Sequence, residues 1–159
     1  MYKCGDKILH PLHGVGVVES IQDQEVLGMT KKYYIVNLTM KKMTVMIPME
    51  SCEEIGVRKI IKTQVIDEVL DGLKCKKTSE MPSNWNRRYK HNLDKIRTGD
   101  VHEVADVLRN LYIKDKRKGL SMGEKKMMDN AMNLIVGEIV CAKKMTMEKA
   151  KACVMEALH

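Results

Sequence analysis

The chain has no Phe, one Trp and only three Pro among its 159 residues. With Trp85 and five Tyr as the aromatic side chains, the core is expected to be aliphatic, with many of the 14 Met residues filling irregular gaps. The five Cys residues are odd in number and widely spaced, and they form neither a C-x-x-C pair nor a Cys–His cluster with zinc-ligand spacing. We therefore expect reduced thiols in a cytoplasmic protein that holds no metal and no cofactor.

Long apolar runs and catalytic signatures are missing as well. No apolar stretch approaches the roughly 20 residues needed to cross a membrane, and the first residues lack the apolar core of a signal peptide. Gly14-Val15-Gly16 lacks the third Gly of a dinucleotide-binding loop, and His10-x-x-His13 has no supporting ligand, so both are interpreted as strand or turn features. Without a Ser/His/Asp arrangement, a Walker loop or paired carboxylates, we expect no enzyme, no small-molecule substrate and no membrane contact.

Positive charge is concentrated in the C-terminal part of the chain. The formal net charge is +7, yet residues 1–60 contain eight Lys/Arg against seven Asp/Glu. Residues 74–97 contain eight Lys/Arg against two Asp/Glu, and residues 114–126 contain six against two. This distribution indicates an anionic partner for the C-terminal part, although a solvated basic surface that aids solubility is an equally open alternative.

The hydrophobic period changes from that of strands to that of helices near residue 55. Short strands are predicted over 7–10, 14–21, 33–39 and 43–47, with hairpin links at 23–32 and 40–42. Helices are predicted over 57–73, from 83 or 84 to 98, over 100–118, from 121 onward, and over 146–158, from their cap residues. The sequence thus predicts an α+β protein in which a small β-barrel, residues 1–55, is followed by a compact all-α domain, residues 56–159.

The only Trp lies in a basic segment, residues 84–93. On a helix, Trp85 falls in a stripe about 80° wide with Tyr89, Leu93 and Ile96, which favours a buried ring. Trp85 also lies in the first helical turn, where its ring can project past the helix end. The basic residues that leave the stripe and can meet phosphates are Arg87, Arg88, Lys90 and Lys95. An aromatic ring flanked by Arg and Lys is what binding of unstacked or kinked DNA requires, so both interpretations of Trp85 remain open.

Several motifs, in one order along almost the whole chain, resemble the CarD/CdnL family of bacterial transcription factors. They are Lys3-x-Gly5-Asp6, His10-Pro11-x-His13-Gly14, Thr44-Val45-x-Ile47-Pro48, Gly56-Val57-Arg58, Asn84-Trp85-x-Arg87-Arg88-Tyr89-Lys90-x-Asn92-Leu93, Thr98-Gly99-Asp100-Val101 and Gly119-Leu120-Ser121-x-Gly123-Glu124-Lys125.

The resemblance implies a Tudor-like N-terminal barrel that binds the β subunit of RNA polymerase, and a helical domain that places a Trp at the upstream edge of the transcription bubble. Trp85 matches that Trp. The DNA-contacting positions expected with it are Arg87, Arg88, Lys90, Lys125 and Lys126, and the polymerase-contacting positions are Gln24, Val26, Thr44 and Met46. Family members often carry Arg where this chain has Gln24 and Met46, which argues against salt bridges there. Pairing of the edge strand 43–47 uses backbone groups and does not depend on them.

The sequence therefore predicts a non-enzymatic transcription regulator that contacts the β subunit of RNA polymerase and stabilises the promoter open complex through Trp85 and nearby basic residues. Its partners would be the polymerase and promoter DNA near the upstream fork of the bubble, and it would lie in the cytoplasm, associated with the nucleoid through the polymerase. Two alternatives remain: a nucleoid-type structural protein that binds DNA without sequence preference and without polymerase, and an RNA-binding module. Binding to RNA polymerase separates the first interpretation from both.

Overall fold

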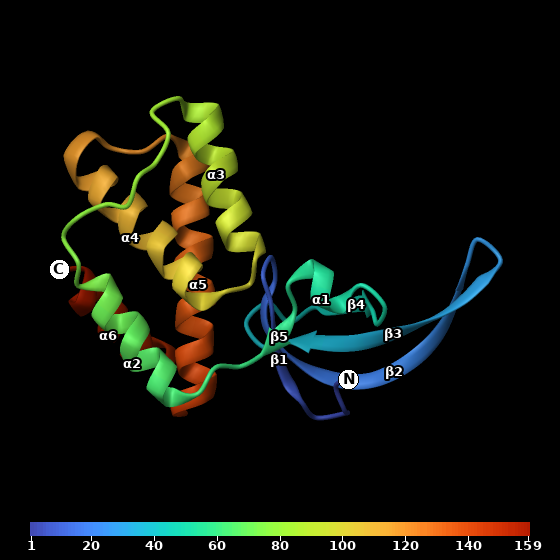
Figure 1. The fold of residues 1–159 in the computed structure, drawn as a ribbon. Coiled ribbons are helices and arrows are strands. Elements are labelled where there is room, and N and C mark those ends of the chain that lie inside the picture. The colour runs from blue at the N-terminus through green and yellow to red at the C-terminus, as the bar shows by residue number, and fades with distance from the viewer.

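The computed structural model describes residues 1–159 and shows an α+β protein, in which an antiparallel sheet precedes a group of helices (Figure 1). The predicted fold class is confirmed at this level. The strands are β1 (Lys7–His10), β2 (Gly14–Val26), β3 (Met29–Leu38), β4 (Thr44–Pro48) and β5 (Arg58–Lys59). The helices are α1 (Cys52–Ile55), α2 (Thr63–Leu73), α3 (Trp85–Arg97), α4 (Val101–Lys118), α5 (Met122–Lys143) and α6 (Met147–Leu158).

The sheet is open. Its strands pair in the order β4-β3-β2-β1-β5, and every neighbouring pair is antiparallel. Because β4 and β5 lie at opposite edges, the closed Tudor-like barrel that was predicted is not confirmed. A small core, to which α1 contributes Cys52, covers one face of the sheet; its other members include Ile8, Val18, Tyr34, Val36 and Ile47. On the opposite face of the sheet, much of β2, β3 and β4 is exposed.

The hairpin of β2 and β3 is longer than predicted. Residues 23–32 were expected to link two strands, but they continue both strands in register as far as the pair Val26 and Met29. The turn consists of Leu27 and Gly28, whose φ angles of 52° and 76° are those of a two-residue turn with a left-handed backbone. Since this extension is solvated on both faces, its sequence lacks the alternation of a half-buried strand. The hairpin projects beyond the rest of the sheet (Figure 1).

The helix predicted over 57–73 begins only at Thr63. Arg58 and Lys59 form β5 instead, and they pair with Leu9 and Ile8 of β1. The edge of β1 is free to pair, so its backbone N–H and C=O groups form hydrogen bonds with Arg58 and Lys59. These two residues are therefore in a strand, although the apolar residues that follow them are spaced as in a helix. The last strand of the sheet thus lies beyond residue 55, the predicted domain boundary, and a fragment of residues 1–55 would lack it.

Helices α3 to α6 begin close to the predicted residues, and α3, α4 and α6 also end close to them. Each begins after a cap whose side-chain oxygen accepts a backbone N–H, and such caps satisfy donors that a helix start leaves unpaired. The caps and their donors are Asn84 with Arg87, Asp100 with His102, Ser121 with Glu124, and Thr146 with Lys149. None of the six helices has both the length and the apolar character that a membrane span requires.

The helices enclose the larger core, and the sheet is packed against it. Leu9 and Val15 of the sheet belong to the same buried cluster as α4 and α5. Gly137 of α5 allows close approach: a Cβ atom there would lie 3.1 Å from the sulfur of Met40 and 3.5 Å from a methyl group of Val15. The sheet and the helical unit therefore share an apolar interface in which a side chain at position 137 would require the Met40 side chain to shift.

An ion pair between the partly buried Arg58 and the buried Glu138 fixes the junction between the sheet and the helices. The guanidinium of Arg58 in β5 donates hydrogen bonds of 2.6 and 2.7 Å to the carboxylate of Glu138 in α5, which also accepts the backbone N–H of Ile61 at 3.0 Å. Beside this pair, Gly56 and Gly99 meet backbone to backbone, and a Cβ atom on Gly99 would collide with the carbonyl of Gly56. The junction thus has one tightly packed arrangement, which sets where the sheet lies relative to the helices.

Candidate functional site

The first turns of α3 and α5 are joined at the end of the helical unit that lies at the top of Figure 1. Trp85 is the first residue of α3, because Asn84 caps that helix by accepting the N–H of Arg87 at 3.1 Å. The hydroxyl of Ser121, the cap of α5, accepts the backbone N–H of Glu124 at 3.2 Å and the indole Nε1–H of Trp85 at 2.9 Å. The cap of one helix thus also orients the Trp ring that begins the other.

The ring of Trp85 is half-buried. It stacks on Tyr89 with a centroid distance of 5.2 Å and an interplanar angle of 21°, and Gly123 lies beside both rings. The stripe predicted from the period is present, and its burial increases along the helix: Ile96 is buried, Tyr89 and Leu93 are partly buried, and Trp85 is 42% exposed. Two interpretations of Trp85 were open, a buried core residue and a ring that projects at the start of a helix. The 42% exposure of Trp85 favours the second.

Arg88, one of the residues predicted to contact DNA, lies in a buried ion pair, unlike the exposed cations predicted with it. Its guanidinium donates to the two oxygens of Glu124 at 2.8 and 3.0 Å and to the carbonyl of Ser83 at 2.9 Å, and the residue is 7% exposed. The hydrogen bond from Arg88 lowers the pKa of the Glu124 carboxyl below its usual value, against the opposing effect of burial. Arg88 therefore holds α3 against α5 beside Trp85, and three of its five N–H donors are engaged within the protein.

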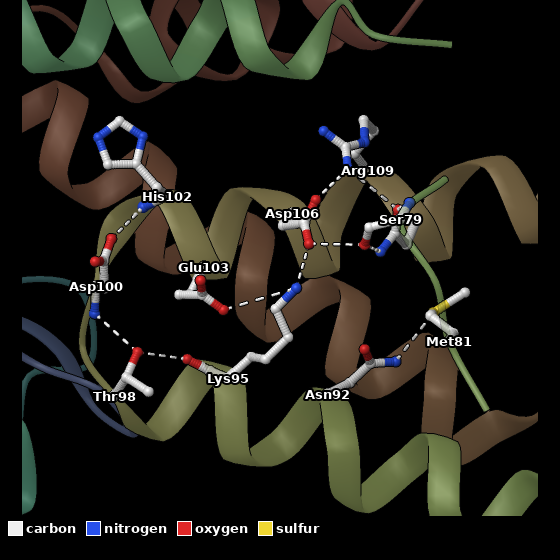
Figure 2. A network of polar contacts seen from close by, with 11 residues as sticks. Ser79, Met81, Asn92, Lys95, Thr98, Asp100, His102, Glu103, Asp106 and Arg109 are labelled. Atoms are coloured by element: carbon white, nitrogen blue, oxygen red, sulfur yellow. Dashed lines mark hydrogen bonds and ion pairs between the residues drawn. The ribbon is translucent and has the colours of Figure 1, made fainter. Parts of the chain in front are cut away.

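A second polar network, shown in Figure 2, holds the segment that precedes α3. Asp106 of α4 accepts the hydroxyl of Ser79 at 2.8 Å and pairs with Lys95 of α3 and with Arg109. The amide of Asn110 meets both the backbone and the hydroxyl of Ser79, at 3.0 and 2.6 Å. Lys95, predicted as able to meet phosphates, is thus occupied inside the protein.

The charge of Asp106 is stabilised by this network. Burial raises the pKa of the Asp106 carboxyl, but the hydrogen bonds from Lys95 and Ser79 and the charges of Lys95 and Arg109 outweigh it, so the pKa lies below its usual value. The ionised carboxylate of Asp106 in α4 holds Ser79, in the polar segment that precedes α3. It thereby supports the start of α3, where Trp85 lies.

The remaining predicted DNA-contacting residues are brought together. Arg87 and Lys90 on α3, and Lys125 and Lys126 on α5, are exposed at or near the two joined helix starts. Lys90 forms one contact, a 3.3 Å pair with Asp94 one turn along α3, and such exposed pairs are weak. We call Trp85, Arg87, Lys90, Lys125 and Lys126 the basic end of the helical unit.

Sequence reasoning missed a neighbouring group of cations. Lys116, Arg117 and Lys118 form the last turn of α4, which a short loop connects to the start of α5 (Figure 1). They were counted within the basic segment 114–126, but cations also stabilise a helix C-terminus, so the pattern gave no reason to assign them to a site. In the structure Lys116 lies over the ring of Tyr112, with its Nζ 4.9 Å from the ring centroid.

The four residues predicted to contact polymerase lie on one face of the sheet. In the register, Gln24 and Val26 of β2 lie opposite residues 31 and 29 of β3, while Thr44 and Met46 of β4 lie opposite residues 37 and 35. These β3 residues are all odd-numbered and so point to the same face. The four are not adjacent, since β4 pairs only with residues 33–37 and the hairpin tip lies beyond it. We call these four residues the sheet face.

The backbone of β4 has a free side. Leu38 donates to the carbonyl of Met43, and Met49 donates to that of Lys32, so Met43 and Met49 are at hydrogen-bonded positions of the β3–β4 ladder. Such positions alternate along an antiparallel strand. The N–H and C=O groups of Thr44 and Met46 therefore point away from β3, to the free edge, where another strand can add.

The fold and these two surfaces define a class of protein: an antiparallel sheet with a free edge, fixed beside a helical unit with a basic, Trp-bearing end, is the arrangement expected of a CarD-like transcription factor. The comparisons with known proteins agree. The family model of the CarD-like/TRCF RID domain matches residues 2–61, and that of the CarD C-terminal domain matches residues 68–155. The chain belongs to the CarD family.

A relative supports the same assignment over the full length. A protein of Bacillus subtilis (strain 168), described as "Putative transcription factor YdeB", is 33% identical over 152 residues, which cover 96% of this chain and 99% of the relative. The two family matches divide the chain between β5 and the middle of α2, which is consistent with a sheet that ends at Lys59.

Proposed function

We propose that this protein is a non-enzymatic transcription regulator that binds the β subunit of RNA polymerase through its sheet and stabilises the promoter open complex through its basic end. The observation that carries the proposal is the separation of two unlike surfaces by a fixed junction. One surface is a strand edge with free backbone groups, and the other is a half-exposed Trp surrounded by cations. Family membership supports a role in transcription.

In this mechanism the sheet tethers the helical unit to polymerase. Tethering raises its effective concentration near the promoter, so that weak DNA contacts suffice. Arg87, Lys90, Lys125 and Lys126 hold phosphates without reading sequence. Trp85 stacks beside an unpaired base at the upstream fork, and because that base is exposed only after melting, the contact favours the open state over the closed one. The protein would act in the cytoplasm, wherever polymerase occupies promoters.

The polymerase contact is tested at the free edge of β4. Met46→Pro removes one outward N–H without breaking a hydrogen bond to β3, and proline is tolerated at such edge positions. We expect the folded variant to lose several-fold in affinity for RNA polymerase, as measured by surface plasmon resonance with immobilised holoenzyme, since a strand that adds to β4 loses a backbone partner.

Met46→Ala is the matched control, because it removes the side chain and keeps the N–H. Equal weakening by both variants would assign the contact to the side chain. Unchanged binding by a folded Met46→Pro protein, judged by circular dichroism, would contradict strand addition at β4.

The phosphate contacts are tested by salt dependence. Replacing an exposed lysine that contacts a phosphate reduces the slope of log affinity against log salt by about one unit. We expect Lys90→Gln to show this reduction on duplex promoter DNA measured by fluorescence anisotropy from about 50 to 200 mM salt. Lys151→Gln is the control of equal charge, since Lys151 is an exposed residue of α6 outside the basic end. Identical slopes for the two variants would show that Lys90 is an ordinary solvated residue.

A further inference from the structure

A groove runs between the sheet and the helices, beside the basic end. Its volume is about 340 Å³, and it lies between the turns around Leu12 and Lys41 on one side and helices α3 and α5 on the other. Tyr89, Leu93 and Met127 give it an apolar and aromatic lining. This volume is within the range of about 300–1,000 Å³ that small-ligand sites occupy.

The polar groups of the groove are suited to an anion that carries a planar ring. Lys41 and Lys126 supply two positive charges, Asn130 and Asn133 supply amides that can donate and accept, and no Asp or Glu lines the groove. An aromatic side chain beside Lys and amide groups is a common setting for an unstacked nucleobase and its phosphate. The lysines come from different parts of the chain, since Lys41 lies in the turn between β3 and β4 and Lys126 lies in α5.

The groove is continuous with the site of Trp85. Tyr89 lines the groove and also stacks on the ring of Trp85, and Gly123 both lines the groove and lies beside the two rings. A strand whose first unpaired base stacks on Trp85 would therefore find an aromatic, positively charged groove directly adjacent.

We propose that this groove receives an unpaired nucleotide of single-stranded DNA next to the one at Trp85, with Lys41 of the turn between β3 and β4 holding its phosphate. The proposal rests on the proposed function and extends it, because it makes the polymerase-binding part of the chain a direct DNA contact. Charge complementarity and continuity with Trp85 favour a DNA strand as the occupant. A paired base in a duplex is stacked on both faces and cannot enter.

The test compares two neighbouring lysines in the full-length protein. Lys41 lines the groove, whereas Lys42 is an equally charged, exposed neighbour that does not. The probes are a labelled DNA fork with an unpaired thymidine tail and the corresponding blunt duplex, with binding measured by fluorescence anisotropy at several salt concentrations. We expect Lys41→Gln to weaken fork binding and to reduce its salt slope by about 0.7 unit, with little effect on the blunt duplex, and Lys42→Gln to leave both unchanged.

A second variant fills the groove without changing charge. Asn130 is exposed, so Asn130→Trp should leave the melting temperature near that of the wild type. We expect it to abolish the preference for the fork while it retains affinity for the blunt duplex. Equal behaviour of the Lys41 and Lys42 variants, or wild-type fork binding by Asn130→Trp, would overturn the proposal. Displacement of the fork by thymidine monophosphate at concentrations as low as those of the tail would overturn the DNA-strand assignment in favour of a free nucleotide.

The failure of this proposal is distinguishable from failure of the proposed function. If Trp85→Ala shortens the life of the open complex while the two lysine variants behave alike, only the groove is rejected. If Trp85→Ala has no effect on the open complex, the proposed function itself fails, whatever the groove binds.

Discussion

Replacing Trp85 with Ala is expected to shorten the lifetime of the promoter open complex by about 5- to 150-fold in the presence of this protein, with polymerase binding unchanged. The range follows from the free energy of one base–aromatic stack, about 1–3 kcal/mol, because each factor of ten in an equilibrium corresponds to about 1.4 kcal/mol. Polymerase binding is unaffected because the sheet face lies in the other part of the chain.

The same substitution should destabilise the folded protein by only about 1–2 kcal/mol. The ring is half exposed, and its loss removes one aromatic stack on Tyr89 and one hydrogen bond to Ser121. A fully buried Trp would cost about 3–5 kcal/mol. The measurements are a denaturant melt and an open-complex decay on the same variant. A collapsed melt, or an unchanged decay, would contradict the assignment of Trp85 as the fork contact.

Trp85→Phe is the matched control. It keeps a six-membered ring that can stack on a base and on Tyr89, and it loses the five-membered ring of the indole together with the N–H that Ser121 accepts. We expect it to retain much of the open-complex effect. The fluorescence of this single Trp offers an independent measurement in the wild-type protein: acrylamide should quench it in the free protein, and fork DNA should protect it.

Replacing Glu124 with Ala is expected to reduce the free energy of unfolding by about 3–5 kcal/mol at neutral pH, because it leaves the Arg88 guanidinium buried and unpaired. The neighbouring Lys125→Ala is the control, since Lys125 is exposed and should change stability by less than about 0.5 kcal/mol. Replacing both partners, as Arg88→Met with Glu124→Leu, should recover most of the loss, because apolar residues of similar volume can stand in for a buried pair. A loss as large in the double variant as in Glu124→Ala would contradict this explanation.

The contribution of the Arg88–Glu124 pair should depend on pH. The pKa of the Glu124 carboxyl is lowered in the folded protein by its hydrogen bond to Arg88, so the unfolded chain binds this proton more readily than the folded one. The stabilisation is therefore fully present above the unfolded pKa of about 4.3 and is lost as pH falls through the lower folded value. The difference in unfolding free energy between the wild type and Glu124→Ala should accordingly shrink below about pH 4. A difference that stays constant from pH 7 to about pH 3 would show that the carboxylate charge is not what stabilises the pair.

The helical part was largely predictable because its signals are local. Asn84, Asp100, Ser121 and Thr146 each accept a backbone N–H of the next few residues, so a short stretch of sequence contains both partners. The Ser121 motif was only half predicted. Its Glu124 does not return to the cap but pairs with Arg88, 36 positions away, and no local pattern identifies that partner.

The errors in the sheet have the opposite cause. The extension of β2 and β3 around Leu27 is solvated, so no alternating pattern marks it, and only tertiary pairing makes it a strand. β5 forms because the edge of β1 is available to Arg58 and Lys59, although their neighbours have a helical period. In the site, the choice of Trp85 and of the exposed lysines followed from the sequence. The burial of Arg88 and Lys95 did not, since a long cationic side chain can meet either a phosphate or a carboxylate across the protein.

The central claim of this account is that the protein holds the promoter in its melted state. The most direct test is the lifetime of heparin-challenged open complexes on one defined promoter, with RNA polymerase alone and with polymerase saturated by this protein. The account predicts a longer lifetime when the protein is bound, and a return toward the lifetime of polymerase alone with Trp85→Ala. An unchanged lifetime under saturating polymerase binding would contradict it.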